Sequence, residues 1–209
     1  MRIAKEGLRF IGPGAVLSAL FFWLGWWPAG TFFLIFTAAL LFFFRDPGRM
    51  IPAGENLLVS PADGKVVKIE TGVTHPWLNT SATCVSVFLS LLDVHLTRSP
   101  LSGKVIETEY KPGRFFRADK DEAGRENESN SLLVRGPKTT IVVKQIVGLA
   151  ARRIKCFVRK GDAVSRGQKI GLMYFGSRID IYLPQSVFLT VGLEGKVRAG
   201  ETVIGEIPT

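Results

Sequence analysis

The sequence is poor in cysteine and histidine, with only two of each among its 209 residues. Cys84 and Cys156 each lie in an apolar, strand-like run, and no ladder of paired spacings suggests a disulfide framework. Both thiols are therefore expected to be buried and inert, which fits a reducing cytoplasm. His75 and His95 are not joined by cysteines at zinc-binding spacings, so no metal site is predicted.

Acidic residues are also scarce, because 18 Asp and Glu stand against 27 Lys and Arg and leave a net charge of +9. A chain this basic is suited to nucleic acid or to anionic lipid. A nucleic-acid surface would interleave aromatic and basic side chains, whereas most aromatic residues here fall in one apolar block. The composition therefore favours a membrane surface, where each well-placed cation gains about 1 kcal/mol from anionic headgroups.

Charge is absent from residues 11–44, a block that holds three of the four tryptophans. As one straight helix this block would be about 50 Å long, against a hydrocarbon core of about 30 Å. Pro28, flanked by Gly25 and Gly30, predicts a break in the middle. We therefore expect a hairpin of two short helices that dips into the bilayer, or spans it if the bilayer thins. A buried core helix of a soluble protein is the alternative.

Basic residues flank the apolar block on both sides. Arg2, Lys5 and Arg9 precede it, and Arg45 and Arg49 follow it. Cationic flanks favour the cytoplasmic side, so both ends of the hairpin should lie there. The block is too long for a cleaved signal peptide and lacks a small-residue cleavage site. The rest of the chain is expected on the cytoplasmic side of the inner membrane.

From Asn56 onward the pattern changes to short β-like runs separated by Gly, Pro and Asn, which favours a mostly antiparallel barrel or sandwich. A charge-dense stretch within residues 110–130 is expected to form a mobile loop or short helix over a site, with solvated surface as the alternative. The predicted domains are an N-terminal hairpin with its linker, residues 1–50, and a mainly β domain, residues 51–209. The predicted strands are Leu57–Ser60, Gly64–Thr71, Thr83–Ser90, Gly103–Thr108, Ser131–Arg135, Thr139–Val147, Ile154–Phe157, Lys169–Phe175 and Arg178–Leu183.

Residues 160–171 contain the pattern Gly-Asp-x-Val-x-x-Gly-x-x-Ile-Gly. Gly161 and Gly167 are expected in turns with positive φ, and Val164 and Ile170 should pack inward. The pattern resembles a turn-and-strand element of barrel-sandwich hybrid domains, the fold of biotinyl and lipoyl carriers. Such carriers present a modifiable lysine on a tight hairpin, usually beside methionine, and no Met-Lys pair exists here. The resemblance therefore supports the fold and not the carrier function.

Three other stretches place reactive side chains at the ends of predicted strands. Asp63 lies in the turn Ser-Pro-Ala-Asp-Gly, His95 in Asp-Val-His-Leu-Thr-Arg-Ser-Pro, and Ser177 directly after Gly176. Together Asp, His and Ser can orient and deprotonate a serine hydroxyl. Each also has an ordinary structural explanation, as a turn cap, a hydrogen-bonded histidine or a bend residue. The nucleophile elbow G-x-S-x-G is absent, so an ordinary serine hydrolase is not predicted.

In combination these stretches resemble the phosphatidylserine decarboxylase proenzyme family, and in particular its short prokaryotic, membrane-associated branch. The resemblance rests on SPADG, DVHLTRSP, the pair Asn127-Glu128 and above all FGSRIDIYLP, with FFRDPGRMIP as a similar linker. It extends from about Phe42 to Pro184. Two positions depart from the pattern of many members, because Thr97 replaces Asn and Ser129 replaces Arg.

The resemblance implies a self-processing enzyme that depends on a covalent pyruvoyl group. Ser177 would attack the carbonyl of Gly176, and the chain would divide into a β chain, residues 1–176, and an α chain that begins with a pyruvoyl group derived from Ser177. His95 would be the general base, and Asp63 would orient its imidazole. The mature enzyme would convert phosphatidylserine to phosphatidylethanolamine and CO2, with the pyruvoyl carbonyl as electron sink.

Two alternatives stay open at this point. The lipid substrate could instead be an ether-linked serine phospholipid of the archaetidylserine type, because the headgroup reaction would be the same. A member of another class, a non-catalytic membrane-anchored barrel-sandwich adaptor, would use Ser177 only as a bend residue. Assembly into a homo-oligomer is also left open, and Arg98, Arg114, Arg117 and Arg178 are phosphate-binding candidates on charge alone.

Overall fold

The computed structural model describes residues 2–149, 153–174 and 176–208. The chain divides into two compact units, Met1–Gly48 and Arg49–Thr209. The first is helical and the second is mainly β, which confirms the predicted fold class. Each unit is described by itself.

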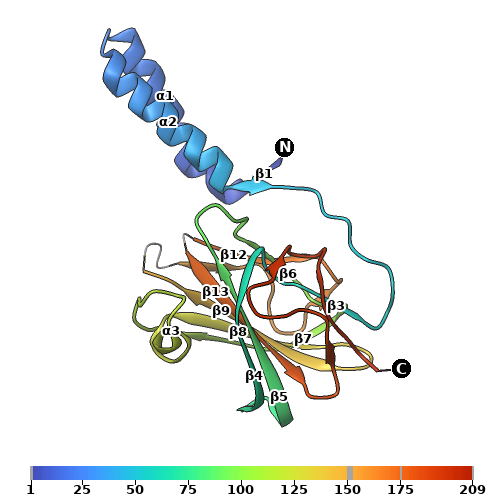
Figure 1. Ribbon diagram of the computed structural model, residues 1–209. Coiled ribbons are helices and arrows are strands. Elements are labelled where there is room, and N and C mark those ends of the chain that lie inside the picture. Colours follow the sequence, from blue (N-terminus) through green and yellow to red (C-terminus); the bar gives the residue numbers. More distant parts are fainter. Residues whose placement is uncertain (1, 150–152, 175, 209) are drawn as a thin grey trace. The chain divides into compact units, whose positions relative to one another are not determined.

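The first unit is built from two helices, α1 (Leu8–Trp23) and α2 (Trp27–Phe43), which lie side by side in Figure 1. Gly25 has a φ of 75° and forms the turn between them, and Pro28 lies in the first turn of α2, where its missing N–H is tolerated. The break therefore falls where the sequence predicts it. Shorter elements at the base are β1 (Arg2–Ile3), the 3-10 helix η1 (Lys5–Gly7) and β2 (Arg45–Asp46).

Small residues allow the two helices to approach closely. A side chain at Gly14 would collide with the hydroxyl of Thr37, and one at Gly30 would collide with the ring of Phe22. The hydroxyl of Ser18 donates a hydrogen bond of 2.9 Å to the carbonyl of Gly30. Most large aromatic side chains point outward instead, Trp23 and Trp27 among them. Among the described residues, neither helix reaches the length and apolar character that crossing a bilayer requires.

The second unit is organised around a curled eight-stranded antiparallel sheet with the order β11-β7-β8-β9-β13-β5-β4-β15 (Figure 1). Its strands are β4 (Gly64–His75), β5 (Leu78–Leu89), β7 (Gly103–Lys111), β8 (Ser129–Arg135), β9 (Thr140–Val147), β11 (Ala163–Val164), β13 (Ser177–Pro184) and β15 (Lys196–Val197). Two three-stranded sheets complete the unit. They contain β10 (Ile154–Cys156), β12 (Lys169–Met173) and β6 (Leu96–Arg98), and β14 (Phe188–Leu189), β16 (Val203–Glu206) and β3 (Leu57–Val59).

The alternation of β13 separates the core from the outer face of the sheet. Ile179, Ile181 and Leu183 are fully buried in the hydrophobic core, while Arg178 and Asp180 belong to the opposite face. The turn pattern at residues 160–171 also forms as predicted. Gly161 and Gly167 have φ values of 96° and 76°, and Val164 and Ile170 are buried.

The structure contains every predicted strand and several that the sequence pattern does not reveal. Strand β6 was not predicted because its three residues include only one apolar side chain, whereas the equally short β3 and β10 contain two or three. Strand β11 and the strands after Pro184 have two to four residues, too few to display a period. The hairpin of β4 and β5 is longer than predicted, so that His75 lies in a strand and its ring packs against Tyr182. Within the charge-dense stretch, residues 121–126 form the helix α3 (Asp121–Glu126).

Candidate functional site

The Gly176–Ser177 peptide bond lies at the start of β13, between the ends of two neighbouring strands. Ser177 pairs with Leu89, the last residue of β5, and with Val147, the last residue of β9. Ser177 is fully buried, and Gly176 has a φ of 65°, a conformation that favours glycine. The chain therefore bends immediately before the serine and holds it in the middle of the sheet.

His95 contacts this bend directly. Its Nε2 accepts a hydrogen bond of 3.2 Å from the backbone N–H of Gly176, and its Nδ1 lies 2.9 Å from the carbonyl oxygen of Asp93. Because Nε2 accepts, Nδ1 must carry the proton and donate to Asp93. The fully buried imidazole therefore presents an unprotonated nitrogen to Gly176, which is the form that a general base needs.

A tight turn fixes the carbonyl that orients His95. The Asp93 carboxylate accepts hydrogen bonds from the backbone N–H and the hydroxyl of Ser90, at 2.8 and 2.6 Å. The N–H of Asp93 donates in return to the carbonyl of Ser90 at 3.0 Å. No role for Asp93 is evident from the sequence alone, although the residue stands in the motif that contains His95.

The hydroxyl of Ser177 donates to the carbonyl of Tyr174, at a long distance of 3.4 Å. His95 therefore contacts the nitrogen of Gly176, and Ser177 follows Gly176 directly in the chain with its hydroxyl turned to Tyr174. A rotation about the Cα–Cβ bond of Ser177 is the motion that would redirect the hydroxyl.

Asp63 lies at the same end of the sheet but has other partners. Arg49 Nη2 donates to both of its carboxylate oxygens, at 2.7 and 2.9 Å, and the N–H of Ala199 donates to Oδ1 at 2.7 Å. Asp63 precedes β4, whose Lys65 pairs with Phe88, one residue before the Leu89 that faces Ser177. Sequence reasoning did not foresee Arg49 as its partner.

Asn127 ties the loop of residues 112–120 to the end of β9. Its side-chain amide donates to the carbonyl of Val147, and its side-chain oxygen accepts from the N–H of Phe116, both at 2.8 Å. The N–H of Val147 donates to the carbonyl of Glu128 at 3.1 Å. The Asn127-Glu128 pair therefore fixes the strand end that lies opposite Ser177.

Gly148 makes close approach to the candidate bond possible. A side-chain carbon at this position would lie 2.0 Å from the carbonyl oxygen of Gly176. Only glycine leaves space for that oxygen, so Gly148 belongs to the site on steric grounds. No local pattern points to Gly148, because the contact joins two strand ends that are distant along the chain.

The four arginine candidates for phosphate binding fall into two groups. Arg178 is buried on the outer face of the sheet, where its Nε lies 2.8 Å from Asp180 and its Nη1 donates to the carbonyls of Ala118 and Lys120. Arg98 is buried and donates to the carbonyl of Gly167. Arg114 and Arg117 are exposed and form exposed ion pairs with Glu126 and Asp119. Arg178 therefore fastens the loop of residues 112–120 to β13.

Burial shifts the pKa values of two groups on the strands that flank β13. Burial lowers the pKa of the Lys144 ammonium, which donates to the carbonyl of Gly124. Burial raises the pKa of the Cys84 thiol to about 12, so this thiol is inert. Cys156 was also expected to be buried but is only half-buried, and neither cysteine forms a disulfide. Within residues 2–149, 153–174 and 176–208, no three His, Cys, Asp or Glu side chains gather into a set that could hold a metal ion.

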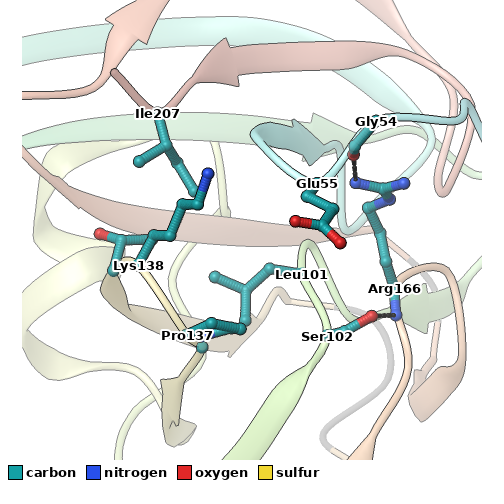
Figure 2. Close-up of a pocket in the computed structure, with 10 residues that line it drawn as sticks. Gly54, Glu55, Leu101, Ser102, Pro137, Lys138, Arg166 and Ile207 are labelled. Carbon is teal, nitrogen blue, oxygen red and sulfur yellow. Dashed lines mark hydrogen bonds between the residues drawn. The ribbon is translucent and has the colours of Figure 1, made fainter. Parts of the chain in front are cut away.

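A cavity of about 510 Å³ lies away from this site (Figure 2). It is lined by Leu101, Pro137, Lys138 and Ile207 among others, and Arg166 on its wall donates to the carbonyls of Gly54, Leu57 and Pro52. Residues 136–139 precede β9, whereas Ser177 faces the last residue of that strand. The cavity is therefore near the opposite end of β9 and does not contain the candidate bond.

Comparison with known proteins gives a consistent result. The sequence model of a family described as phosphatidylserine decarboxylase matches residues 36–205. Proteins named phosphatidylserine decarboxylase proenzyme are similar over almost the whole chain. The one from Beijerinckia indica subsp. indica is 41% identical over 99% of this chain and 90% of its own length. The one from Geotalea uraniireducens is 41% identical over 99% of this chain and 97% of its own length. The one from Syntrophus aciditrophicus is 42% identical over 97% of this chain and 96% of its own length.

Proposed function

The chain belongs to the phosphatidylserine decarboxylase family, and we infer that it is a self-processing carboxy-lyase that converts phosphatidylserine to phosphatidylethanolamine and CO2. The single observation that best supports this function is the hydrogen bond between His95 Nε2 and Gly176, the residue directly before the buried Ser177. We further propose residues 1–50 as a membrane-associated hairpin with linker, and residues 51–209 as the catalytic domain.

Processing would begin with Ser177 and His95. Nε2 of His95 takes the hydroxyl proton, and the serine oxygen forms a bond to the carbonyl carbon of Gly176. The bond between that carbon and the nitrogen of Ser177 then breaks, and the imidazolium returns its proton to the departing nitrogen. The peptide becomes an ester between Gly176 and the serine oxygen, and His95 is neutral again.

Cleavage would follow by β-elimination. The neutral imidazole removes the Cα proton of Ser177, the bond between Cβ and oxygen breaks, and Gly176 leaves as the carboxylate that ends the β chain. The remaining dehydroalanine tautomerises to an imine, and water releases ammonia from it. The α chain, residues 177–209, then begins with a pyruvoyl group, and no external oxidant or reductant is required.

The residues around Ser177 fit such a group. The position is fully buried, lies between two strands and faces a histidine that can hold or supply a proton. The pyruvoyl group supplies a ketone that accepts electrons when the serine headgroup loses CO2. His95 would deliver the proton that replaces the carboxylate, and the buried surroundings would keep water away from the reacting carbon.

Asp63 is proposed to support His95 as a nearby negative charge, because the Asp93 carbonyl already orients the ring. Asp63→Asn keeps the shape and an acceptor for the Ala199 N–H but removes the charge. A negative charge would stabilise the imidazolium that forms when His95 takes the hydroxyl proton, so its loss should raise the barrier to that step. We therefore expect the maximal processing rate to fall about tenfold.

The control is Glu201→Gln, because Glu201 is the other carboxylate beside Arg49, at 3.5 Å. It should leave the processing rate within about twofold of the wild type. If Glu201→Gln slows processing as much as Asp63→Asn does, loss of the Arg49 ion pair explains the effect and the proposed role of the Asp63 charge is wrong.

The membrane assignment rests on the first unit. Its helices expose Trp, Phe and Leu side chains over much of their surface, and Arg2, Arg45 and other cations lie at their base. We propose that this unit inserts into the inner membrane and keeps the catalytic domain on the cytoplasmic side, where anionic lipids and the phosphatidylserine substrate would meet the site.

The experiment that tests the function supplies two lipids to the purified full chain. Vesicles that contain phosphatidylserine should yield phosphatidylethanolamine and CO2, whereas vesicles that contain an archaetidylserine-type ether lipid test the alternative substrate. Product from the ether lipid alone would change the assigned substrate. No product from either lipid by fully processed protein would contradict the assigned reaction.

A further inference from the structure

Three loops around the Gly176–Ser177 bond expose large apolar side chains. Leu91 and Leu92 are 56% and 71% exposed, Leu149 is 61% exposed and Phe116 is 38% exposed. Isolated exposed apolar residues are ordinary on protein surfaces, but a group around one site indicates an interaction surface. We name these four residues the apolar rim.

Strand pairing places two parts of the rim beside the candidate bond. Ser177 pairs with Leu89 and with Val147, and both of those residues end their strands. Leu91 and Leu92 therefore follow β5 just beyond Ser177, and Leu149 follows β9 at the same end of these strands.

The remaining member of the rim is tied to the same end of these strands by side-chain hydrogen bonds. The N–H of Phe116 donates to Asn127, and Asn127 in turn donates to the carbonyl of Val147, both at 2.8 Å. The whole rim therefore surrounds one end of β13.

The rim is also linked to the catalytic geometry. Leu91 and Leu92 occupy the middle of the turn that Ser90 and Asp93 close with hydrogen bonds of 2.6 to 3.0 Å. The carbonyl of Asp93 in this turn orients His95. A partner that binds the two leucines would therefore contact the segment that positions the general base.

Basic side chains accompany the rim. Arg114 and Arg117 flank Phe116 on its loop, and their side chains are 74% and 69% exposed. Arg153 and Lys155 are exposed beside Ile154, which pairs with Met173 three residues before Gly176. Exposed ion pairs such as Arg114–Glu126 are weak, so these cations can exchange their partners for phosphate groups.

We propose that the apolar rim and these cations dock the catalytic domain onto an anionic phospholipid bilayer, so that the substrate headgroup enters from the membrane. Apolar side chains that insert below a ring of cations are the arrangement that such a surface binds. The proposal rests on the proposed function, and it adds a second membrane contact to the helical unit.

The chain offers a matched control. Phe188 is 67% exposed, as apolar as the rim, and follows the other end of β13. Eight strand residues separate the two ends, which corresponds to about 25 Å. A bilayer that receives the rim should therefore not receive Phe188.

The first test measures insertion and needs no turnover. The full chain carries one environment-sensitive fluorophore on an introduced cysteine, either Leu92→Cys or Phe188→Cys, in a Cys156→Ser background. With vesicles of about seven parts phosphatidylcholine to three parts phosphatidylglycerol, the label at position 92 should shift to the blue and be quenched by spin-labelled lipid. The label at position 188 should do neither. Equal, water-like emission from both labels on membrane-bound protein would overturn the proposal, whether or not the protein is a decarboxylase.

The second test separates docking from chemistry. Leu92→Asn combined with Leu149→Asn should reduce kcat/KM for phosphatidylserine in vesicles about tenfold, while kcat/KM for monomeric short-chain phosphatidylserine stays within about twofold. Self-cleavage should be complete, and Phe188→Asn should behave like the wild type. An equal loss on both substrates, or no loss on vesicles, would contradict the proposal. Inactivity of the wild type on both substrates would instead refute the proposed function and leave the fluorescence result standing.

Discussion

Replacement of Ser177 by alanine is expected to leave a single uncleaved chain with no decarboxylase activity. The alanine side chain has no oxygen to attack the Gly176 carbonyl, so neither the ester nor the pyruvoyl group can form. Because the group that would accept electrons is then missing, activity should fall to the level of the uncatalysed reaction. Denaturing electrophoresis of the purified variant and a headgroup-decarboxylation assay measure the two effects.

Ser86→Ala is a suitable control for this variant. Ser86 is a buried serine on β5, and it pairs with Asp180 three residues after Ser177. Its loss removes a buried hydroxyl from the same part of the sheet, yet cleavage should proceed. An alanine variant at 177 that still divides at the same bond would show that another nucleophile is responsible.

Replacement of His95 by alanine is expected to slow self-cleavage at least about 100-fold, because a positioned general base contributes factors of that size. The imidazole is the group whose unprotonated nitrogen accepts the Gly176 N–H, so its loss also removes the partner of that N–H. The rate can be followed by pulse labelling during synthesis in a cell-free system. His75→Ala is the control, because His75 lies on β4 against Trp77 and Tyr182.

A normal cleavage rate in His95→Ala would remove this residue from its proposed role. Slow cleavage in both histidine variants would point to damaged folding rather than lost chemistry. Circular dichroism of each purified variant distinguishes these explanations.

Local patterns were enough to predict much of the fold. The period-two alternation of residues 178–183 predicted both faces of β13, and Pro28 with its neighbouring glycines predicted the break between the helices. Gly161 and Gly167 marked turns because positive φ strongly favours glycine. Each of these features is decided within a few residues, so a single sequence carries the signal.

The contacts within the site were less accessible, because they join distant parts of the chain. Asp63 and the N–H of Ala199 that binds it are 136 positions apart. Gly148 matters only because the carbonyl of Gly176 lies against it. No periodic pattern in the sequence indicates that such distant residues lie close together in the fold. The motif around His95 suggested the histidine, but only the folded turn identifies the Asp93 carbonyl as the group that orients it.

The measurement that tests the central claim most directly is the intact mass of the mature protein purified from cells. We expect two chains, residues 1–176 and residues 177–209, with the second about 17 Da lighter than a chain with an N-terminal serine because ammonia has been lost. A single unbroken chain of 23.0 kDa with an unmodified serine at position 177 would contradict the account and favour the non-catalytic adaptor.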